Sequence, residues 1–180
     1  VGIILLFVGI AYAPAIAQNT EKQSASRGTW LYVGGSGPGN YTRIQDALDN
    51  ASPGDTIYVY AGTYKELITV RTPVHLIGQH RLTTILDGNF IETVVTILAD
   101  GTTMTGFTVK NSRYYIMAAG IMVQANYTSI KNCEVCDNYQ GIFLHCYTTR
   151  IHHNLISGNW LHHNFDSIKF QGSYSEASNN

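Results

Sequence analysis

The 180-residue chain has little charge and little cysteine, and both shortages exclude classes of protein. Only 13% of the residues are charged and the formal net charge is −1, so the sequence lacks the basic face that a nucleic-acid partner requires. Three cysteines allow at most one intrachain disulfide, which excludes a small domain built on a disulfide framework. We therefore expect an apolar core to hold the fold together, and no nucleic acid among its partners.

Long hydrophobic runs are missing after the first few residues. The run from Val1 to about Ala13 is shorter than the ~20 residues that span a bilayer, and Ala15-Ile16-Ala17 follows it as a small-x-small cleavage pattern. We predict that residues 1–17 are a signal peptide whose basic start is missing, with an uncleaved anchor as the alternative. Residues 18–29 are then a flexible polar lead-in, and the protein is secreted, periplasmic or at the cell surface. Beyond this segment we expect no transmembrane span.

Glycosylation sequons fit such a location. The candidate acceptors are Asn40 and Asn126, while a third sequon at Asn50 falls at a probable helix end.

A repeat runs through the second half of the chain. Residues 120–138 align with residues 141–159 at an offset of 21, so that Ile121 matches Ile142 and, in this alignment, Ile130 matches Ile151. Upstream and downstream units align at an offset of 26. We assign the five-residue difference between the two offsets to a loop of variable length, which is formed by residues 113–119, 139–140 and 160–166 in successive units. Register kept on both sides of a variable loop indicates a structural repeat.

Apolar residues alternate within each unit, which is strand periodicity. Three short strands per unit, separated by turns rich in Asn and Gly, predict one coil of a solenoid whose coils stack on a shared core. A short amphipathic helix precedes them, with Thr42 as its predicted N-cap, Gln45 completing a capping box, and an apolar stripe of Ile44, Ala47 and Leu48. We expect this helix to cap the first coil of a domain spanning 30–180, which is incomplete at its C-terminus because the chain stops within a unit.

Specific motifs resemble a known family. The stretch YTRIQDALDNASPGDTIYVYAGTY, the later GFTVKNS, and the repeated GI-x-V/L and I-x-x-N-x-I-x-x-N patterns are similar to right-handed parallel β-helix proteins of the pectate-lyase-like superfamily, and within it to the NosD-like secreted and surface repeat proteins. The resemblance implies an all-β fold. It also implies a ligand groove along the outer face of the strand that begins with Gly-Ile, beside the variable loops.

Aromatic and polar residues gather at this implied groove. Aromatic rings with amide and imidazole donors suit the faces and hydroxyls of sugars, so we expect a polysaccharide or a cell-surface glycan as partner, together with further domains of the same chain. Alternatively, the rings pack the loops onto the sheet or await another domain. The candidate groove residues are Tyr114, Tyr115, Tyr139, Phe143, His145, Trp160, Lys169 and Gln171.

Catalysis is not expected within this segment. Hydrolysis of a glycosidic bond needs a pair of carboxylates, and the groove-side loops offer only Asp166, with Asp137 at an edge. The main hypothesis is therefore a non-catalytic module that binds or organises polysaccharide. The alternatives are a polysaccharide lyase or glycoside hydrolase whose catalytic coils lie beyond residue 180, and a copper-handling protein of the kind that the NosD-like resemblance implies.

We expect no cofactor; the alternative is copper, bound through His145, His162 and His163, because imidazole is a copper ligand. The pair Cys133 and Cys136 lacks the second C-x-x-C that a four-cysteine zinc site has. In the repeat, Cys133 falls on a position held elsewhere by an inward Asn, and Cys136 falls at a turn edge. We predict that both are structural.

Overall fold

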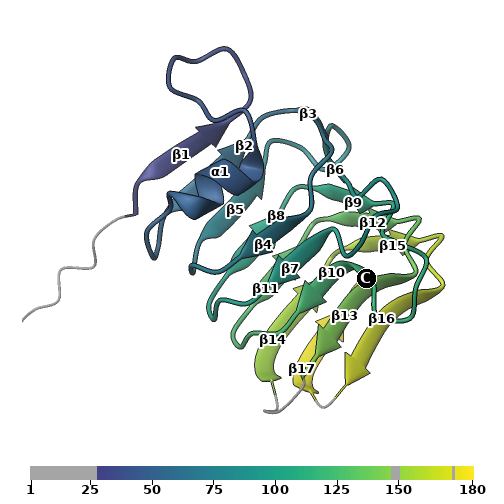
Figure 1. Ribbon diagram of the computed structural model, residues 1–180. Coiled ribbons are helices and arrows are strands. Elements are labelled where there is room, and N and C mark those ends of the chain that lie inside the picture. Colours follow the sequence, from purple (N-terminus) through teal and green to yellow (C-terminus); the bar gives the residue numbers. More distant parts are fainter. Residues whose placement is uncertain (1–27, 147–150, 172) are drawn as a thin grey trace, which may run out of the picture.

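The computed structural model describes residues 28–146, 151–171 and 173–180, which form a right-handed parallel β-helix of about five turns (Figure 1). The predicted signal peptide and residues 18–27 of the lead-in lie outside the described residues. Each complete coil contributes one strand to each of three sheets, so the predicted three-strand unit is confirmed.

The three sheets, here called A, B and C, are parallel throughout, and successive coils supply neighbouring strands. Sheet A contains β1 (Trp30–Val33), β2 (Thr56–Val59), β5 (His75–Gly78), β8 (Thr103–Thr105), β11 (Ser129–Lys131), β14 (Ile151–Ser157) and β17 (Ser173–Ser178). Sheet B contains β3 (Gly62–Tyr64), β6 (Thr84–Asp87), β9 (Thr108–Lys110), β12 (Glu134–Cys136) and β15 (Trp160–His162). Sheet C contains β4 (Ile68–Val70), β7 (Val95–Ile97), β10 (Ala119–Val123), β13 (Gln140–His145) and β16 (Asp166–Gln171).

Apolar residues of successive coils stack to form one core inside the three sheets. Ile121 of β10 lies between Val95 of β7 and Ile142 of β13, and all three side chains are fully buried. The alternation in the sequence directs these residues inward and their neighbours outward, so each coil covers the apolar face of the next.

The corners between sheets share a two-residue motif, in which a residue with positive φ is followed by a residue whose backbone N–H is bound by a ladder side chain. At the corner between sheets B and C, Asp137 and His163 adopt positive φ angles of 56° and 54°, and a ladder residue follows each of them. There the backbone N–H of Ser112 donates to Asn138 Oδ1 at 2.9 Å, and the N–H of Asn138 donates to Asn164 Oδ1 at 3.0 Å. The left-handed residue turns the chain, and the buried amide satisfies backbone groups that no strand pairs.

A second Asn ladder lies at the corner between sheets A and B. The N–H of Cys133 donates to Asn159 Oδ1 at 3.0 Å, and the N–H of Asn159 donates to Asn180 Oδ1 at 3.1 Å. Cys133 is fully buried in this ladder. The prediction that Cys133 occupies an Asn position is therefore confirmed.

The predicted register beyond Cys146 is wrong. Ile130 pairs with Ile156 rather than Ile151. Ten residues separate Leu144 from Leu155 where five separate their partners Val123 and Ser129, so the five additional residues follow the Gly-Ile strand instead of lying in the loop before it. The offset is 21 across β10 and β13, but 26 across β11 and β14 and across β12 and β15. Residues 160–162 consequently form strand β15 of sheet B rather than a loop.

The predicted N-cap of helix α1 (Ile44–Asp49) is also wrong. Arg43 rather than Thr42 is the N-cap residue, and no side chain caps the helix locally. The carboxylate of Glu66 instead accepts hydrogen bonds from the backbone N–H groups of Ile44 at 3.0 Å and Gln45 at 3.2 Å. A carboxylate from the first coil thus satisfies the helix N-terminus and complements its positive end.

The predicted stripe of α1 is buried, with Ile44, Ala47 and Leu48 at most 5% exposed. The helix contacts β1, β2 and β4 and covers the first coil (Figure 1). The predicted capping role of the helix is confirmed.

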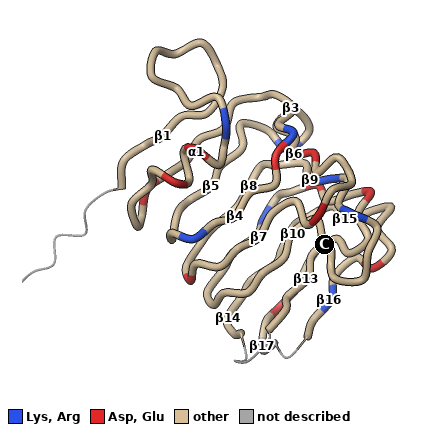
Figure 2. Tube along the Cα trace, in the orientation of Figure 1, with Lys and Arg blue, Asp and Glu red and all other residues tan. Residues whose placement is uncertain are grey.

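Charged residues of both signs are interspersed over the coils (Figure 2). Among the residues that the structure describes, no helix is long and apolar enough to cross a membrane.

Candidate functional site

Aromatic side chains line one corner of the solenoid. Tyr139 stacks on Phe165 with a centroid distance of 4.9 Å and an interplanar angle of 11°, and Tyr114 meets Tyr139 edge-on at 4.9 Å. Tyr139 and Phe165 follow equivalent turns of successive coils, whereas Tyr114 comes from the longer turn between β9 and β10. We call Tyr114, Tyr139 and Phe165 the aromatic edge.

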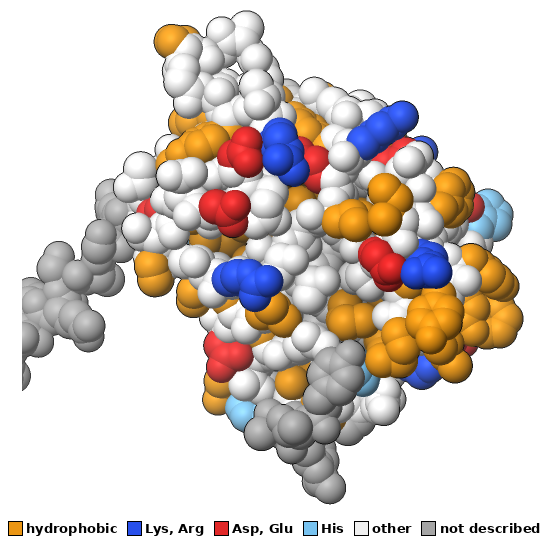
Figure 3. Space-filling view, in the orientation of Figure 1, with side chains coloured by type: hydrophobic (Ala, Val, Ile, Leu, Met, Phe, Trp, Pro, Cys, Tyr) orange, Lys and Arg blue, Asp and Glu red, His pale blue; other side chains and the backbone are white. Residues whose placement is uncertain are grey.

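A hollow of about 430 Å³ lies against the aromatic edge. Tyr114 and Phe165 are 71% and 64% exposed, so apolar ring surface faces solvent there. Figure 3 shows hydrophobic side chains gathered on the side of the molecule where the ends of β12 and β15 lie. The hollow combines ring faces with amide, carboxylate and imidazole groups, and its lining residues are Phe90, Ser112, Tyr114, Asp137, Asn138, His163, Asn164 and Phe165.

The outer face of sheet C, where the sequence places a groove, is largely covered at β13. Phe143 is fully buried and His145 is 3% exposed. Lys169 of β16 lies with its Nζ 5.2 Å from the centre of the Phe143 ring, and the imidazole of His145 lies 3.4 Å from Gln124 Nε2. Phe143, His145 and Lys169 are therefore brought together as a packed cluster, while the neighbouring Gln171 is exposed.

Burial lowers the pKa of His145 below its usual 6.5, and the charge of Lys169 lowers it further. The folded chain thus binds this proton less readily than the unfolded chain. His145 should leave stability intact above pH 6.5 and reduce it as the pH falls through the lowered pKa of the folded state. We expect His145→Gln to lose less stability than the wild type between pH 7 and pH 5, measured by urea unfolding. His80→Gln, at an exposed position, is the control, and an unchanged pH profile for His145→Gln contradicts the prediction.

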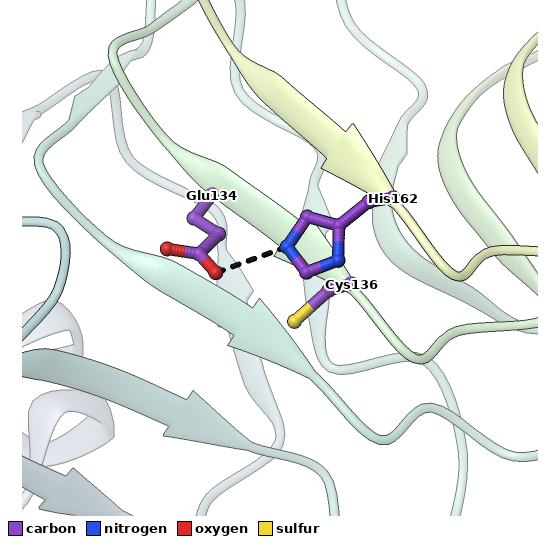
Figure 4. A group of neighbouring side chains, drawn as sticks. All are labelled: Glu134, Cys136 and His162. Carbon is purple, nitrogen blue, oxygen red and sulfur yellow. Dashed lines mark hydrogen bonds and ion pairs between the residues drawn. The ribbon is translucent and has the colours of Figure 1, made fainter.

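Three chemically different side chains meet on the outer face of sheet B (Figure 4). Glu134 and Cys136 project from β12, and His162 projects from β15 with its Nε2 3.0 Å from Glu134 Oε1. The ring of Trp160 lies 4.4 Å from the ring of His162. Trp160 is 52% exposed. We call Glu134, Cys136, Trp160 and His162 the sheet B cluster.

The two cysteines of the C-x-x-C sequence point in different directions. Cys133 faces the core and Cys136 faces outward beside Glu134. Burial raises the pKa of the Cys136 thiol to about 12, with further contributions from Asp137 and Glu134, and burial raises that of Cys133 to about 11. Both thiols are protonated at neutral pH, and their divergence argues against a redox pair.

The predicted histidine trio is divided between two sheets. His162 and His163 lie together, with 3.0 Å between their Nδ1 atoms, whereas His145 belongs to β13 of sheet C. The two candidate glycosylation residues make hydrogen bonds through their amides: Asn40 Nδ2 donates to the carbonyl of Gly34, and Asn126 Nδ2 donates to Asp100. The remaining groove candidate, Tyr115, is 54% exposed and lies under the guanidinium of Arg113 at 5.5 Å.

Sequence reasoning missed an aromatic group on sheet A. Trp30 and Tyr32 of β1 stack at 6.1 Å, and Tyr32 also lies 6.3 Å from Tyr60. Tyr58 of β2 completes the group. The alternating aromatic residues in WLYV and TIYVY were the signal for it, because positions two apart share one face of a strand.

Solved structures confirm the architecture. The chain resembles pectin methylesterase from carrot (TM-score 0.58, 17% identity, 86% of this chain and 55% of that chain) and pectin methylesterase PemA from Erwinia chrysanthemi (0.54, 16%, 71% and 49%). It also resembles ybhc of Escherichia coli (0.54, 12%, 96% and 59%). At these identities the likeness shows the fold, and the chain spans about half the length of these structures.

Sequence comparison adds a family. No curated protein matches the chain significantly. Residues 78–180 match the model of a family described as a protein of unknown function, DUF1565. This match covers more than half of the chain and includes the coils that carry the aromatic edge and the sheet B cluster. The chain therefore belongs to the DUF1565 family, on a pectate-lyase-like β-helix fold.

Proposed function

We propose that this protein is a secreted or cell-surface module that binds polysaccharide without transforming it. The observation that carries the proposal is the aromatic edge, where exposed rings from neighbouring turns border a hollow lined with polar groups. Aromatic faces bind the apolar faces of sugar rings, and the surrounding amides and carboxylate suit sugar hydroxyls.

The place of this surface differs from the groove expected from sequence. Phe143 and His145 are buried among their neighbours, whereas Tyr114 and Phe165 expose most of their side chains. We therefore assign sugar binding to the corner between sheets B and C. Two fold neighbours support a polymeric ligand: one is named a pectin methylesterase, and another was solved in complex with a hexasaccharide.

The proposal predicts that truncating the aromatic edge weakens binding. An array of plant and microbial polysaccharides, pectin included, identifies the glycan that the protein retains. Calorimetry with this glycan should then show about fivefold weaker binding for Tyr139→Ala and for Phe165→Ala, since a lost aromatic contact costs about 1 kcal/mol. Each variant removes ring area from the edge without altering the core.

The matched control is Tyr127→Ala, which removes a tyrosine that is 57% exposed and stacks on His153 at another corner. Equal losses in this control and at the aromatic edge contradict the assignment of the site. Release of methanol, reducing ends or unsaturated products from the bound glycan replaces the binding proposal by a catalytic one.

A further inference from the structure

Glu134, Cys136 and His162 offer a carboxylate oxygen, a sulfur and an imidazole nitrogen that all lie within 4.8 Å of one another. We propose that these three side chains bind a single zinc ion, with a solvent molecule as the fourth ligand. None of the three ligands belongs to the aromatic edge, although Asp137 and His163 beside them also line its hollow, and the proposal does not depend on sugar binding.

The sheet fixes the three positions. Glu134 and Cys136 are two residues apart on β12 and share its outer face, and His162 of β15 pairs directly with Cys136. Parallel neighbours lie about 4.8 Å apart, so the register alone places the imidazole beside the thiol. Ligands held on adjacent strands are better positioned than ligands on loops.

The chemistry of the set favours zinc over other biological metals. A carboxylate, a thiolate and a neutral imidazole together neutralise a divalent ion, and zinc accepts all three donor types at about 2.0–2.3 Å. Magnesium and calcium prefer oxygen ligands alone, while copper(I) prefers softer donors than a carboxylate. Three protein ligands and one open position is the arrangement of zinc sites that keep a bound water.

A second layer of contacts orients the imidazole. His162 Nδ1 lies 3.0 Å from His163 Nδ1. When His162 carries its proton on Nδ1 and donates it to His163, the lone pair on Nε2 is free and points at Glu134 and Cys136. Metal-binding histidines are commonly held by such a partner on the second ring nitrogen. His163 in turn lies 3.9 Å from Asp137, and Trp160 packs against the His162 ring.

The site is sheltered but open to solvent. The side chains of His162 and Glu134 are 25% and 13% exposed, and Cys136 is 5% exposed. Lys110 of β9, which pairs with Cys136 on the other side, is the neighbouring cation. Its positive charge opposes a metal ion, whereas the carboxylates of Glu134 and Asp137 beside Cys136 supply two negative charges that attract one.

The test uses the reduced, purified chain and zinc chloride alone. Calorimetry should show one zinc per chain, and cobalt(II) in place of zinc should give a thiolate-to-cobalt charge-transfer absorption. Cys136→Ser and His162→Gln should each weaken zinc binding by at least about a hundredfold, and His163→Asn by about tenfold. Cys146→Ser and His152→Gln, which change the same residue types elsewhere, should bind zinc as the wild type does.

Far-ultraviolet circular dichroism checks that each variant is folded. If a variant is misfolded, the wild-type protein loaded with cobalt(II) still tests the proposal. A wild-type spectrum that lacks the thiolate-to-cobalt charge-transfer band overturns the site. Zinc binding that survives Cys136→Ser or His162→Gln in a folded variant also overturns it. Stoichiometric copper(II) uptake that depends on His163 but not on Cys136, without zinc binding, replaces it by a histidine copper site.

Discussion

Asn138→Ala is expected to lower the free energy of unfolding by about 3–4 kcal/mol. The side chain is 3% exposed; its Oδ1 accepts from the backbone of Ser112, and its Nδ2 donates to the carbonyls of Val109 at 3.2 Å and Cys136 at 2.8 Å. Alanine leaves these backbone groups without their partner inside the corner, and each unsatisfied buried group costs about 1–3 kcal/mol. Urea unfolding followed by circular dichroism measures the loss.

The control for this prediction is Asn50→Ala at the exposed C-cap of α1, where Nδ2 donates to the carbonyl of Asp46. It should cost less than about 1 kcal/mol, because water replaces the lost bond. A loss of similar size in both variants contradicts the prediction, because the buried Asn138 would then contribute no more to the free energy of unfolding than the exposed Asn50. Asn138→Asp separates the two halves of the amide, since it keeps an acceptor for Ser112 and loses every hydrogen bond that Nδ2 donates.

Phe107→Ala should destabilise the protein by about 3–5 kcal/mol. Phe107 is among the largest fully buried side chains, and it occupies the corner position that holds Cys133 in the next coil. Gly78 makes room for it: a Cβ at Gly78 would lie 3.2 Å from Phe107 Cδ2 and 2.2 Å from the carbonyl oxygen of Gly106. A backbone this close to the ring collapses little into the space that alanine leaves, so the cavity persists.

Phe107→Leu should recover more than half of that loss, because it refills most of the volume. Phe165→Ala is the matched control, with a ring that is 64% exposed, and it should change stability by less than about 1 kcal/mol. Thermal and urea unfolding of the three variants give the comparison. A small loss for Phe107→Ala, near that of Phe165→Ala, indicates that the corner repacks.

The fold was predictable because its signal is repeated. Ile121 and Val123 alternate with outward residues, and the same alternation returns in β7 and β13 with matching register. Local pattern and tertiary stacking therefore agree, which is why the sheets and the capping role of α1 could be inferred from sequence. The N-cap could not, because Glu66 reaches the helix from the first coil, across 22 residues of chain from Ile44.

The register error came from a degenerate apolar pattern. Ile151 and Ile156 are both buried, and strand β14 has an irregularity between His152 and Leu155, so either isoleucine fits the alignment with Ile130. The ladder was the better guide, since Asn138 and Asn164 are 26 residues apart and hydrogen-bond directly. Without that register, the sequence could not place His162 beside Glu134 and Cys136.

The grouping of the rings in the aromatic edge was predicted in part. Tyr114 and Tyr139 do lie together, but Phe165 was missed because the shifted alignment put Trp160 in the position equivalent to Tyr139. Phe143 and His145 alternate outward as expected, yet Lys169 packs over the ring of Phe143. Alternation gives the face of a strand and does not tell whether a neighbouring side chain covers it.

The separation of the rings in the aromatic edge also bears on ligand length. Tyr139 and Phe165 lie 4.9 Å apart, the distance between parallel strands, so a polymer laid along this corner would meet a ring on each of two successive coils. Such groups behave as linked weak sites, and each contact raises the effective concentration at the next. Under the proposed function, avidity would grow with the number of sugar units that contact the two coils, and a shallow surface would then discriminate long chains from short oligomers without a deep pocket.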